Sequence, residues 1–522
     1  MNLRPSKALS VAAALAFLVA AGCTDPTVAP QSTVTSANIW ADQGSYASYM
    51  AKLYGGLLLT GQQGPHGNAD IAGIDEGFSS YFRLFWYMQE VPTDEAVIGW
   101  GDPGLDFINR LNWDASNGMV VAMYYRIYFQ VVLANEFLRQ TTLDQLNARG
   151  VGATLKATIQ QYRAEARFLR ALAYAHGMDL FGPIPFTTEA NTVGSIPPQV
   201  SRQAIYDYVV GELIAIKDSL PPVAGNYGRA TAAAANMLLA EVYLNAGVYT
   251  GTPHYDLALN AAAAAISGPY SLAPVFRNNF TADNNLSPEL IFGVVEDGTH
   301  SQTWGGMTFL VHAGCGGSMS AATYGMDYCW GGYRMKQQAY RLFGAGDSRG
   351  AFFWTAGQTD SVINISWFSS GIAAPKFTNN NSTGPGSMGT QIDTDFPVFR
   401  LAEAYLIYAE ANLRGGGGSP ATALGYMNAL RQRAYGNATH NWLSIGAITL
   451  DTILAERGRE LLFEAKRRTD LIRFARFTGG TYLWAWKGNT PGGTSIPDKY
   501  NLYPLPANEL SANPSLVQNP GY

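Results

Sequence analysis

The chain has 522 residues, of which 34 are basic and 39 acidic, so its formal net charge is −5. Charged residues make up only 14% of the chain and aromatic residues 12%. This balance excludes an intrinsically disordered chain, which needs high charge and few aromatic residues. It also argues against a nucleic-acid partner, because binding phosphates requires a basic face. The length allows a large core that needs neither a metal nor a disulfide to hold it.

Residues 1–22 have the layout of a secretory signal peptide, in which a short basic region precedes an apolar run ending at Ala21. That run is too short to span a bilayer comfortably. Small residues lead directly to Cys23, which resembles the bacterial lipobox, where the cysteine carries lipid after cleavage. The alternative is an ordinary cleavage site followed by an accidental cysteine. The polar, proline-containing stretch 23–36 predicts a lipidated tether, and no later run has the length of a membrane helix.

Helical periodicity dominates residues 37–270 and returns later in the chain. Helices are predicted over 117–140, 157–181, 231–247 and 255–267, and as a further pair within 400–434. The Ala-rich pair has small residues where two helices would cross, and its helix–turn–helix spacing resembles a tetratricopeptide unit. The prediction is a mainly α fold, a tetratricopeptide-like helical-repeat scaffold.

The pattern changes between about residues 271 and 399, where Gly, Asn, Ser and aromatic residues replace the helical periodicity. Short strands are predicted at 290–295 and 362–368. The region 271–522 is therefore expected to be loop-rich, with a long irregular insertion and further helices. Loops of this length in a compact protein are usually functional.

Three stretches carry more specific patterns. Residues 162–185 contain YRAEARFLRA and DLFGPIP, residues 453–473 contain ILAER and DLIR, and residues 503–522 contain YPLP and end in QNPGY. Their order and spacing resemble the SusD/RagB family of outer-membrane lipoproteins, over essentially the whole mature chain. Two departures, Ala465 where the family often has Gly and Arg468 where an aromatic residue is common, lie in the predicted C-terminal scaffold helix.

The resemblance implies a tetratricopeptide-like scaffold that lies at the outer face of the outer membrane and caps a SusC-type TonB-dependent transporter. It implies a ligand that is an oligosaccharide or polysaccharide, or in some members another nutrient such as a peptide. It implies neither catalysis nor a cofactor, and contact with the membrane only through the lipid anchor.

Glu456, Glu460 and Glu464 lie four residues apart and would share one helix face. Glu464 could then meet Arg467 or Arg468 one turn on. The alternative is a carboxylate pair for acid–base chemistry. A face crowded with Arg would keep these acids ionised, so the pattern favours a scaffold role.

Sugar binding needs flat aromatic rings on loops, with amides and carboxylates for the hydroxyl groups. The loop 97–106 offers Trp100, Asp102 and Asp106. The loop 296–335 offers a larger set: Trp304, Tyr324, Asp327, Tyr328, Trp330, Tyr333 and Arg334. The alternative for each single ring is that it fills a small loop core. As a cluster, the second loop favours binding. Trp354 and Trp367 lie in more strand-like sequence.

Cys315 and Cys329 flank the second loop. In an oxidising exterior they could close a ring of about 15 residues, worth about 3 kcal/mol in the chain-entropy model. Such a bond would preorganise the aromatic residues. The alternative is two free buried thiols.

Two other function classes stay open from the sequence. A glycoside hydrolase would need two facing carboxylates, for which Glu296, Asp297 and Asp327 are the candidates. A repeat adaptor would bind peptides on a concave face.

The six His are well separated and form no zinc motif. The GPGSMG stretch at 384–389 follows no hydrophobic strand, so it does not predict a dinucleotide site. Calcium could bind a loop carboxylate such as Asp327, but no EF-hand spacing supports such a site.

Overall fold

The computed structural model describes residues 39–61, 64–65, 67 and 69–522. The predicted signal peptide, Cys23 and the tether lie outside these residues. The chain divides into two compact units, Met1–Ser48 and Tyr49–Tyr522. In the first, the described residues form a 3₁₀ turn, η1 (Ile39–Ala41), and the start of α2 (Ser45–Gly55), and the rings of Trp40 and Tyr46 lie 5.5 Å apart.

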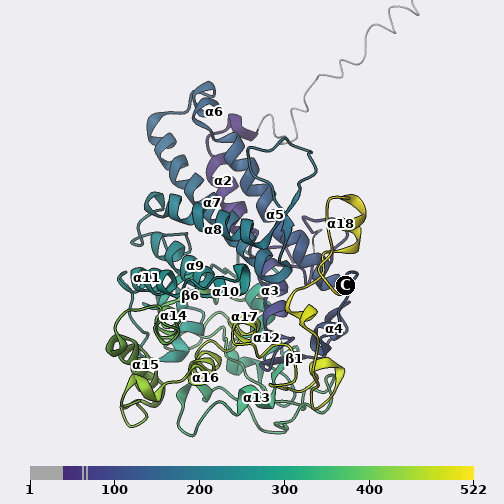
Figure 1. The fold of residues 1–522 in the computed structure, drawn as a ribbon, viewed down its shortest axis with the longest axis vertical. Helices are drawn as coiled ribbons and strands as arrows, with labels where there is room; N and C mark the ends of the chain where they lie inside the picture. Colours follow the sequence, from purple (N-terminus) through teal and green to yellow (C-terminus); the bar gives the residue numbers. More distant parts are fainter. Residues whose placement is uncertain (1–38, 62–63, 66, 68) are drawn as a thin grey trace, which may run out of the picture. The chain divides into compact units, whose positions relative to one another are not determined.

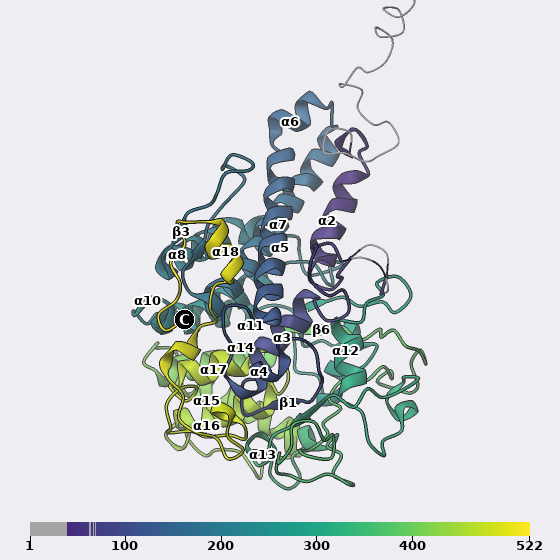
Figure 2. The same cartoon turned by 90° about the vertical axis from the view of Figure 1, so that its right-hand side faces the viewer.

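The second unit begins as a stack of paired helices (Figures 1 and 2). They are α3 (Tyr81–Glu90), α5 (Gly118–Gln140), α6 (Leu143–Ala148), α7 (Ala153–Phe181), α8 (Arg202–Ile216), α9 (Ala232–Leu244), α10 (Ala246–Thr250) and α11 (Tyr255–Ile266). α5 packs on α7, α7 on α8, and α9 on α11. The four predicted helices in this part are confirmed, although the one expected at 231–247 is broken at Asn245 into α9 and α10.

Local sequence explains where these helices begin. The side chains of Asn117, Ser201 and Thr231 each accept a hydrogen bond from a backbone N–H in the first turn of α5, α8 and α9, which satisfies a donor that the helix itself cannot. Ala258 and Ala262 of α11 are fully buried. Their small side chains let α11 lie close to α9 on one side and α14 on the other.

Later helices alternate with long loops. They are α4 (Leu105–Arg110), α12 (Gly306–Ala313), α13 (Gln337–Tyr340), α14 (Leu401–Leu413), α15 (Pro420–Tyr435), α16 (Leu450–Glu460), α17 (Arg467–Arg473) and α18 (Ala507–Ala512). The pair predicted within 400–434 is confirmed as α14 and α15. The expectation of an unbroken loop over 296–335 was wrong, because its apolar stretch GMTFLVHA forms the buried helix α12. No helix in the described residues has the length and apolar composition needed to cross a bilayer.

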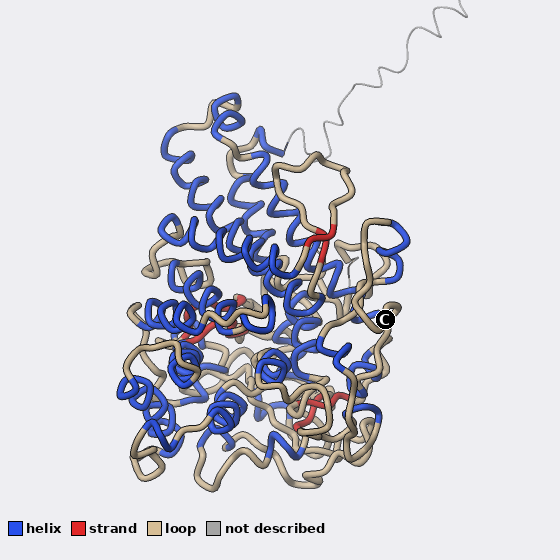
Figure 3. The backbone as a smooth tube through the Cα atoms, viewed as in Figure 1, coloured by secondary structure: helices blue, strands red, loops and turns tan. Residues whose placement is uncertain are grey.

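Strands are few and short, as Figure 3 shows in red. Three antiparallel pairs occur among the described residues: β1 (Ala96–Ile98) with β5 (Tyr333–Met335), β2 (Ile184–Pro185) with β3 (Gln199–Val200), and β4 (Leu290–Val294) with β6 (Phe396–Arg400). The strand predicted at 290–295 is confirmed. The one at 362–368 was wrong: the Ser370 hydroxyl accepts the backbone N–H of Ile363 and of Asn364 and folds this segment into turns.

The glutamates of α16 anchor a buried ionic cluster, which confirms their scaffold role. Glu460 contacts Arg349, Arg400 and Arg433, and although burial opposes ionisation, these guanidinium groups lower its pKa. Because α16 ends at Glu460, Glu464 lies off the helix and contacts Arg400 with both carboxylate oxygens. It also contacts Lys376.

The expected contact of Glu464 with Arg467 or Arg468 was therefore wrong. Arg467 pairs with Asp94 and Arg468 with Asp179. The reason is a break in the predicted helix, where Phe463 and Ala465 have φ values of 63° and 59°. Position 465 thus has the left-handed backbone that glycine adopts most easily.

Candidate functional site

The β1–β5 ladder brings the two predicted binding loops together. Ile98 pairs with Tyr333, so Trp100, two residues after β1, meets the segment just before β5. A side chain at Gly332 would start 2.6 Å from the Trp100 ring. Gly332 is therefore needed for this close approach.

Four rings gather at this junction and form what we call the aromatic platform: Trp100, Trp304, Tyr328 and Trp330. Trp330 lies at its centre, with ring centroids 6.0 Å from Trp100, 6.1 Å from Trp304 and 6.4 Å from Tyr328. Each neighbour is tilted from the Trp330 plane, by 51°, 57° and 40° respectively. Tyr328 is 47% exposed and the three Trp rings are half-buried, so the platform is open to solvent.

His312, on α12, supports the central ring. Its imidazole stacks on Trp330 with centroids 4.7 Å apart and an angle of 24°. Its Nδ1 lies 2.7 Å from the carbonyl oxygen of Tyr328 and its Nε2 2.8 Å from that of Thr390. Burial lowers the pKa of His312, and the two carbonyl contacts oppose this shift. A single side chain thus ties the Tyr328–Trp330 segment to the segment that contains Thr390.

Arg83, on α3, fixes the other rings. Its Nη1 donates to the carbonyl oxygens of Gly77 and Trp304, both at 2.9 Å. Its guanidinium carbon lies 5.6 Å from the Trp100 ring centroid, and its Nη2 lies 3.5 Å from the Asp102 carboxylate. Burial raises the pKa of Asp102, and Arg83 opposes this shift.

Sequence reasoning missed both supports. His312 is in a plain apolar stretch and gave no signal. Arg83 did give one: it is the only charged residue before Glu90 in the otherwise aromatic run YFRLFWYMQE, and such an arginine must find acceptors when buried.

A disulfide between Cys315 and Cys329 closes the segment next to Trp330. Backbone hydrogen bonds run beside it: Trp330 N–H donates to His312 at 2.9 Å, Gly331 to Cys315 at 2.8 Å, and Gly332 to Ala313 at 2.9 Å. The central ring is therefore held by backbone pairing, a covalent link and the His312 stack.

Three predicted ligand residues lie elsewhere. Tyr333 is fully buried, with its hydroxyl donating to the Leu310 carbonyl. Arg334 is also buried and donates to backbone carbonyls that include those of Ser370 and Ile365. Both belong to β5, so their role is structural and the prediction that they contact ligand is corrected. Tyr324 is buried as well, at 9% exposure. Asp327 is exposed and accepts a hydrogen bond from the Thr390 hydroxyl.

Comparison with known proteins agrees with this picture. The sequence profile of the SusD family matches residues 345–522. The starch-binding protein SusD of Bacteroides thetaiotaomicron is 34% identical, over 90% of this chain and 91% of its own. The chain belongs to the SusD family. The predicted resemblance is thereby confirmed.

Solved structures show the same fold. Surface glycan-binding protein A from Bacteroides fluxus superposes with a TM-score of 0.69 at 23% identity, covering 92% of this chain and all of the other. Surface glycan-binding protein A from Bacteroides thetaiotaomicron, in complex with laminarihexaose, superposes with a TM-score of 0.68 at 21% identity. The match covers 91% of this chain and 99% of the other. The predicted mainly α, tetratricopeptide-like class is confirmed. Both of these structures are named as surface glycan-binding proteins.

The carboxylates considered for hydrolysis have other contacts in the structure. Glu296 is buried and accepts the Met307 N–H at the start of α12, and burial raises its pKa well above the usual range. Asp297, in contrast, pairs with His300 at the surface. Among the residues that the structure describes, no group of three or more His, Cys, Asp or Glu side chains could hold a metal ion.

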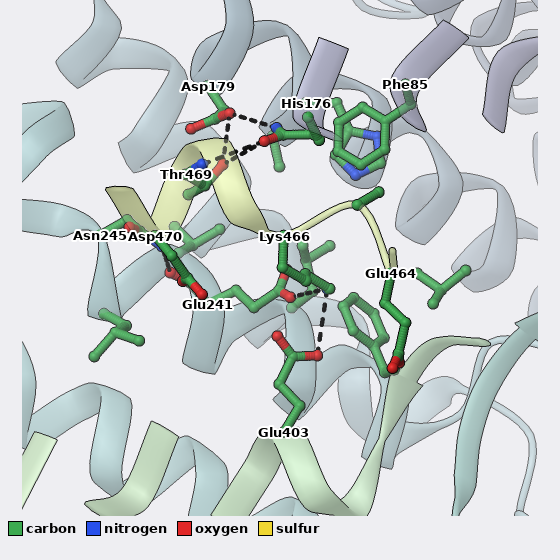
Figure 4. A pocket seen from close by; sticks show the side chains of 18 of the residues that line it. Phe85, His176, Asp179, Glu241, Asn245, Glu403, Glu464, Lys466, Thr469 and Asp470 are labelled. Atoms are coloured by element: carbon green, nitrogen blue, oxygen red, sulfur yellow. Dashed lines mark hydrogen bonds and ion pairs between the residues drawn. The ribbon is translucent and has the colours of Figure 1, made fainter. Parts of the chain in front are cut away.

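A polar cavity lies where helices within residues 82–249 meet the segment 396–473 (Figure 4). It is a cavity of about 60 Å³ in which Lys466 contacts both Glu241 and Glu403. His176 stacks on Phe85 at 3.9 Å, and burial lowers its pKa to about 3. A cavity this small has room for a few water molecules rather than a sugar.

Proposed function

We propose that this SusD-family chain is a surface lipoprotein that captures oligosaccharides or polysaccharides on the aromatic platform and passes them to a SusC-type TonB-dependent transporter. The observation that carries the proposal is the open cluster of four rings around Trp330, set by a ladder between distant parts of the chain. A contiguous patch of aromatic side chains that is open to solvent marks an interaction site, whereas single exposed rings do not.

The platform would bind a sugar chain by covering its C–H faces. Because Arg83 and His312 already fix the rings, little side-chain entropy is lost on binding. The 51° and 57° tilts around Trp330 make the surface curved rather than flat. A curved surface suits a curved glycan, and a relative named as starch-binding makes starch fragments the first probes.

Attachment and transport are the finer parts of the proposal. Cys23 follows small residues, as in a lipobox. Conversion of Cys23 to Ser should abolish labelling by a radioactive fatty acid and release the chain from the outer-membrane fraction. The transporter contact is tested by purifying the lipidated chain from outer membranes and identifying a TonB-dependent receptor at equal stoichiometry.

The platform is tested by Trp330→Ala. We expect loss of most polysaccharide retention in affinity gels, because Trp330 contacts every other ring, while the far-ultraviolet circular dichroism stays unchanged. Trp442→Ala is the matched control: this half-buried ring lies over Arg431, outside the platform. Equal retention by Trp330→Ala and the wild type would reject the platform as the ligand site.

A further inference from the structure

A polar hollow of about 300 Å³ adjoins the platform and has no assigned role. We call it the polar bowl. Its walls are the loop that follows β4, with Thr299 and Gln302, and the segment before β6, with Ser387, Thr390, Gln391 and Asp393. No large aromatic ring lines it. The chemistry it offers is therefore that of amides and hydroxyls, unlike the platform.

The bowl and the platform share supports, so the two lie next to each other. The Thr390 carbonyl holds His312, which stacks under Trp330. The Thr390 hydroxyl donates to Asp327, next to Tyr328 in the chain. The Gln391 side-chain oxygen accepts the Thr303 N–H at 3.1 Å, directly before Trp304. A glycan lying on the platform would thus reach the bowl by extending past Trp304.

Side chains in the bowl have hydrogen-bond donors and acceptors that the protein itself does not use. With its oxygen engaged by Thr303, Gln391 keeps both amide N–H groups free of any hydrogen bond to the described residues. The Gln302 amide donates to the Gly298 carbonyl at 3.1 Å, which leaves its oxygen as an acceptor. Donor and acceptor pairs of this kind match the hydroxyl groups of a sugar ring.

Charge decides which sugars fit. Asp393 accepts hydrogen bonds from the Gly298 N–H and the Ser387 hydroxyl, and Asp327 accepts one from the Thr390 hydroxyl. No Lys or Arg lines the bowl. A carboxylate or sulfate brought here would meet like charges without a counter-ion, which is unfavourable.

We infer that the polar bowl is a second sugar subsite, contiguous with the platform, which binds an uncharged sugar residue through its hydroxyl groups and rejects anionic sugars. This inference rests on the proposed function. It adds that the bowl distinguishes glycans by their length and charge, while the platform contributes affinity for any glycan.

The test compares maltotriose, maltohexaose and hexagalacturonate by isothermal titration calorimetry. The wild type should bind maltohexaose more tightly than maltotriose and should not bind hexagalacturonate. Gln391→Glu keeps the oxygen that Thr303 needs but loses the donors, and Gln302→Ala loses an acceptor. Each should weaken maltohexaose binding about 3- to 10-fold, the effect of one hydrogen bond, and leave maltotriose unchanged.

Gln145→Ala, an exposed amide on α6, should behave as the wild type. Asp327→Asn combined with Asp393→Asn should raise the affinity for hexagalacturonate. An unchanged maltohexaose-to-maltotriose ratio in both Gln variants would overturn the inference while leaving the platform intact. Tight hexagalacturonate binding by the wild type would overturn the inference that the bowl rejects anionic sugars. Undiminished binding of all probes by Trp330→Ala would instead overturn the proposed function.

Discussion

Trp330 shows how one residue can be predicted while its setting cannot. Its place in a Gly- and Tyr-rich loop that also contains Trp304 made it a candidate from the sequence, because exposed aromatic residues on loops suit ligand binding. Its stacking partner His312 is more than fifteen residues away in an apolar helix, and nothing in the spacing connects the two. The same holds for Tyr333 and Arg334: adjacency to Trp330 suggested a shared role, but β5 pairing turns both into the interior.

A buried carboxyl group makes stability depend on pH. Glu90 is fully buried, its Oε1 accepts the Lys466 N–H, and burial raises its pKa to about 7. An unfolded glutamate titrates near pH 4.3, so between these values the folded state holds a proton that the unfolded state has lost. The stabilisation is complete below about pH 4.3 and is lost as the pH rises through about 7.

Glu90→Gln removes this titration and keeps an oxygen for the Lys466 N–H. The free energy of unfolding of the variant should exceed that of the wild type by about 1–3 kcal/mol at pH 8 and by little at pH 5, measured by urea denaturation. Glu509→Gln on α18 is the control. A gain at pH 8 that is equal in both variants, or absent in Glu90→Gln, would refute the assignment.

At the scale of elements, short strand pairs position the site more than the long helices do. The helices around residues 117–140, 157–181 and 255–267 followed from apolar periodicity and capping residues, both local signals. The three-residue β1–β5 ladder, which builds the platform, joins segments more than 200 residues apart. Three-residue strands carry almost no periodicity, so the meeting of the two binding loops could not be derived from the sequence.

The disulfide next to Trp330 gives an element-scale prediction. Replacing Cys315 and Cys329 together by Ser should weaken polysaccharide binding several-fold, because the loop loses a constraint worth about 3 kcal/mol in the chain-entropy model. The helices do not depend on this link, so circular dichroism should be unchanged. Affinity electrophoresis with and without reductant measures the effect: the wild type should weaken on reduction and the double variant should not. Equal binding in all four conditions would mean that the disulfide does not support the platform.

At the scale of the whole second unit, buried ion pairs join segments of the loop-rich part that are far apart in the sequence. Arg400, at the end of β6, contacts Glu289, Glu460 and Glu464, and all four side chains are buried. The regular spacing of the α16 glutamates was visible in the sequence. Their arginine partners were not, because Arg433 lies 27 residues from Glu460 and Arg400 lies 60 residues from it.

Arg400→Met should lower the free energy of unfolding by about 3–5 kcal/mol, since it leaves buried carboxylates without their counter-ion. Arg476→Met removes a surface partner of Asp451 and should cost about 1 kcal/mol or less. Chemical denaturation of both variants at pH 7 makes the comparison. Similar losses in the two would show that the buried cluster does not stabilise the loop-rich part.

The most direct test of the account is a crystal structure of the chain with maltohexaose, or with whichever oligosaccharide of the affinity panel binds best. The account predicts a sugar ring against Trp330, flanked by Trp100 and Trp304, with the glycan extending past Trp304 toward Gln391. A glycan bound elsewhere on the molecule, with the platform rings uncovered, would contradict it.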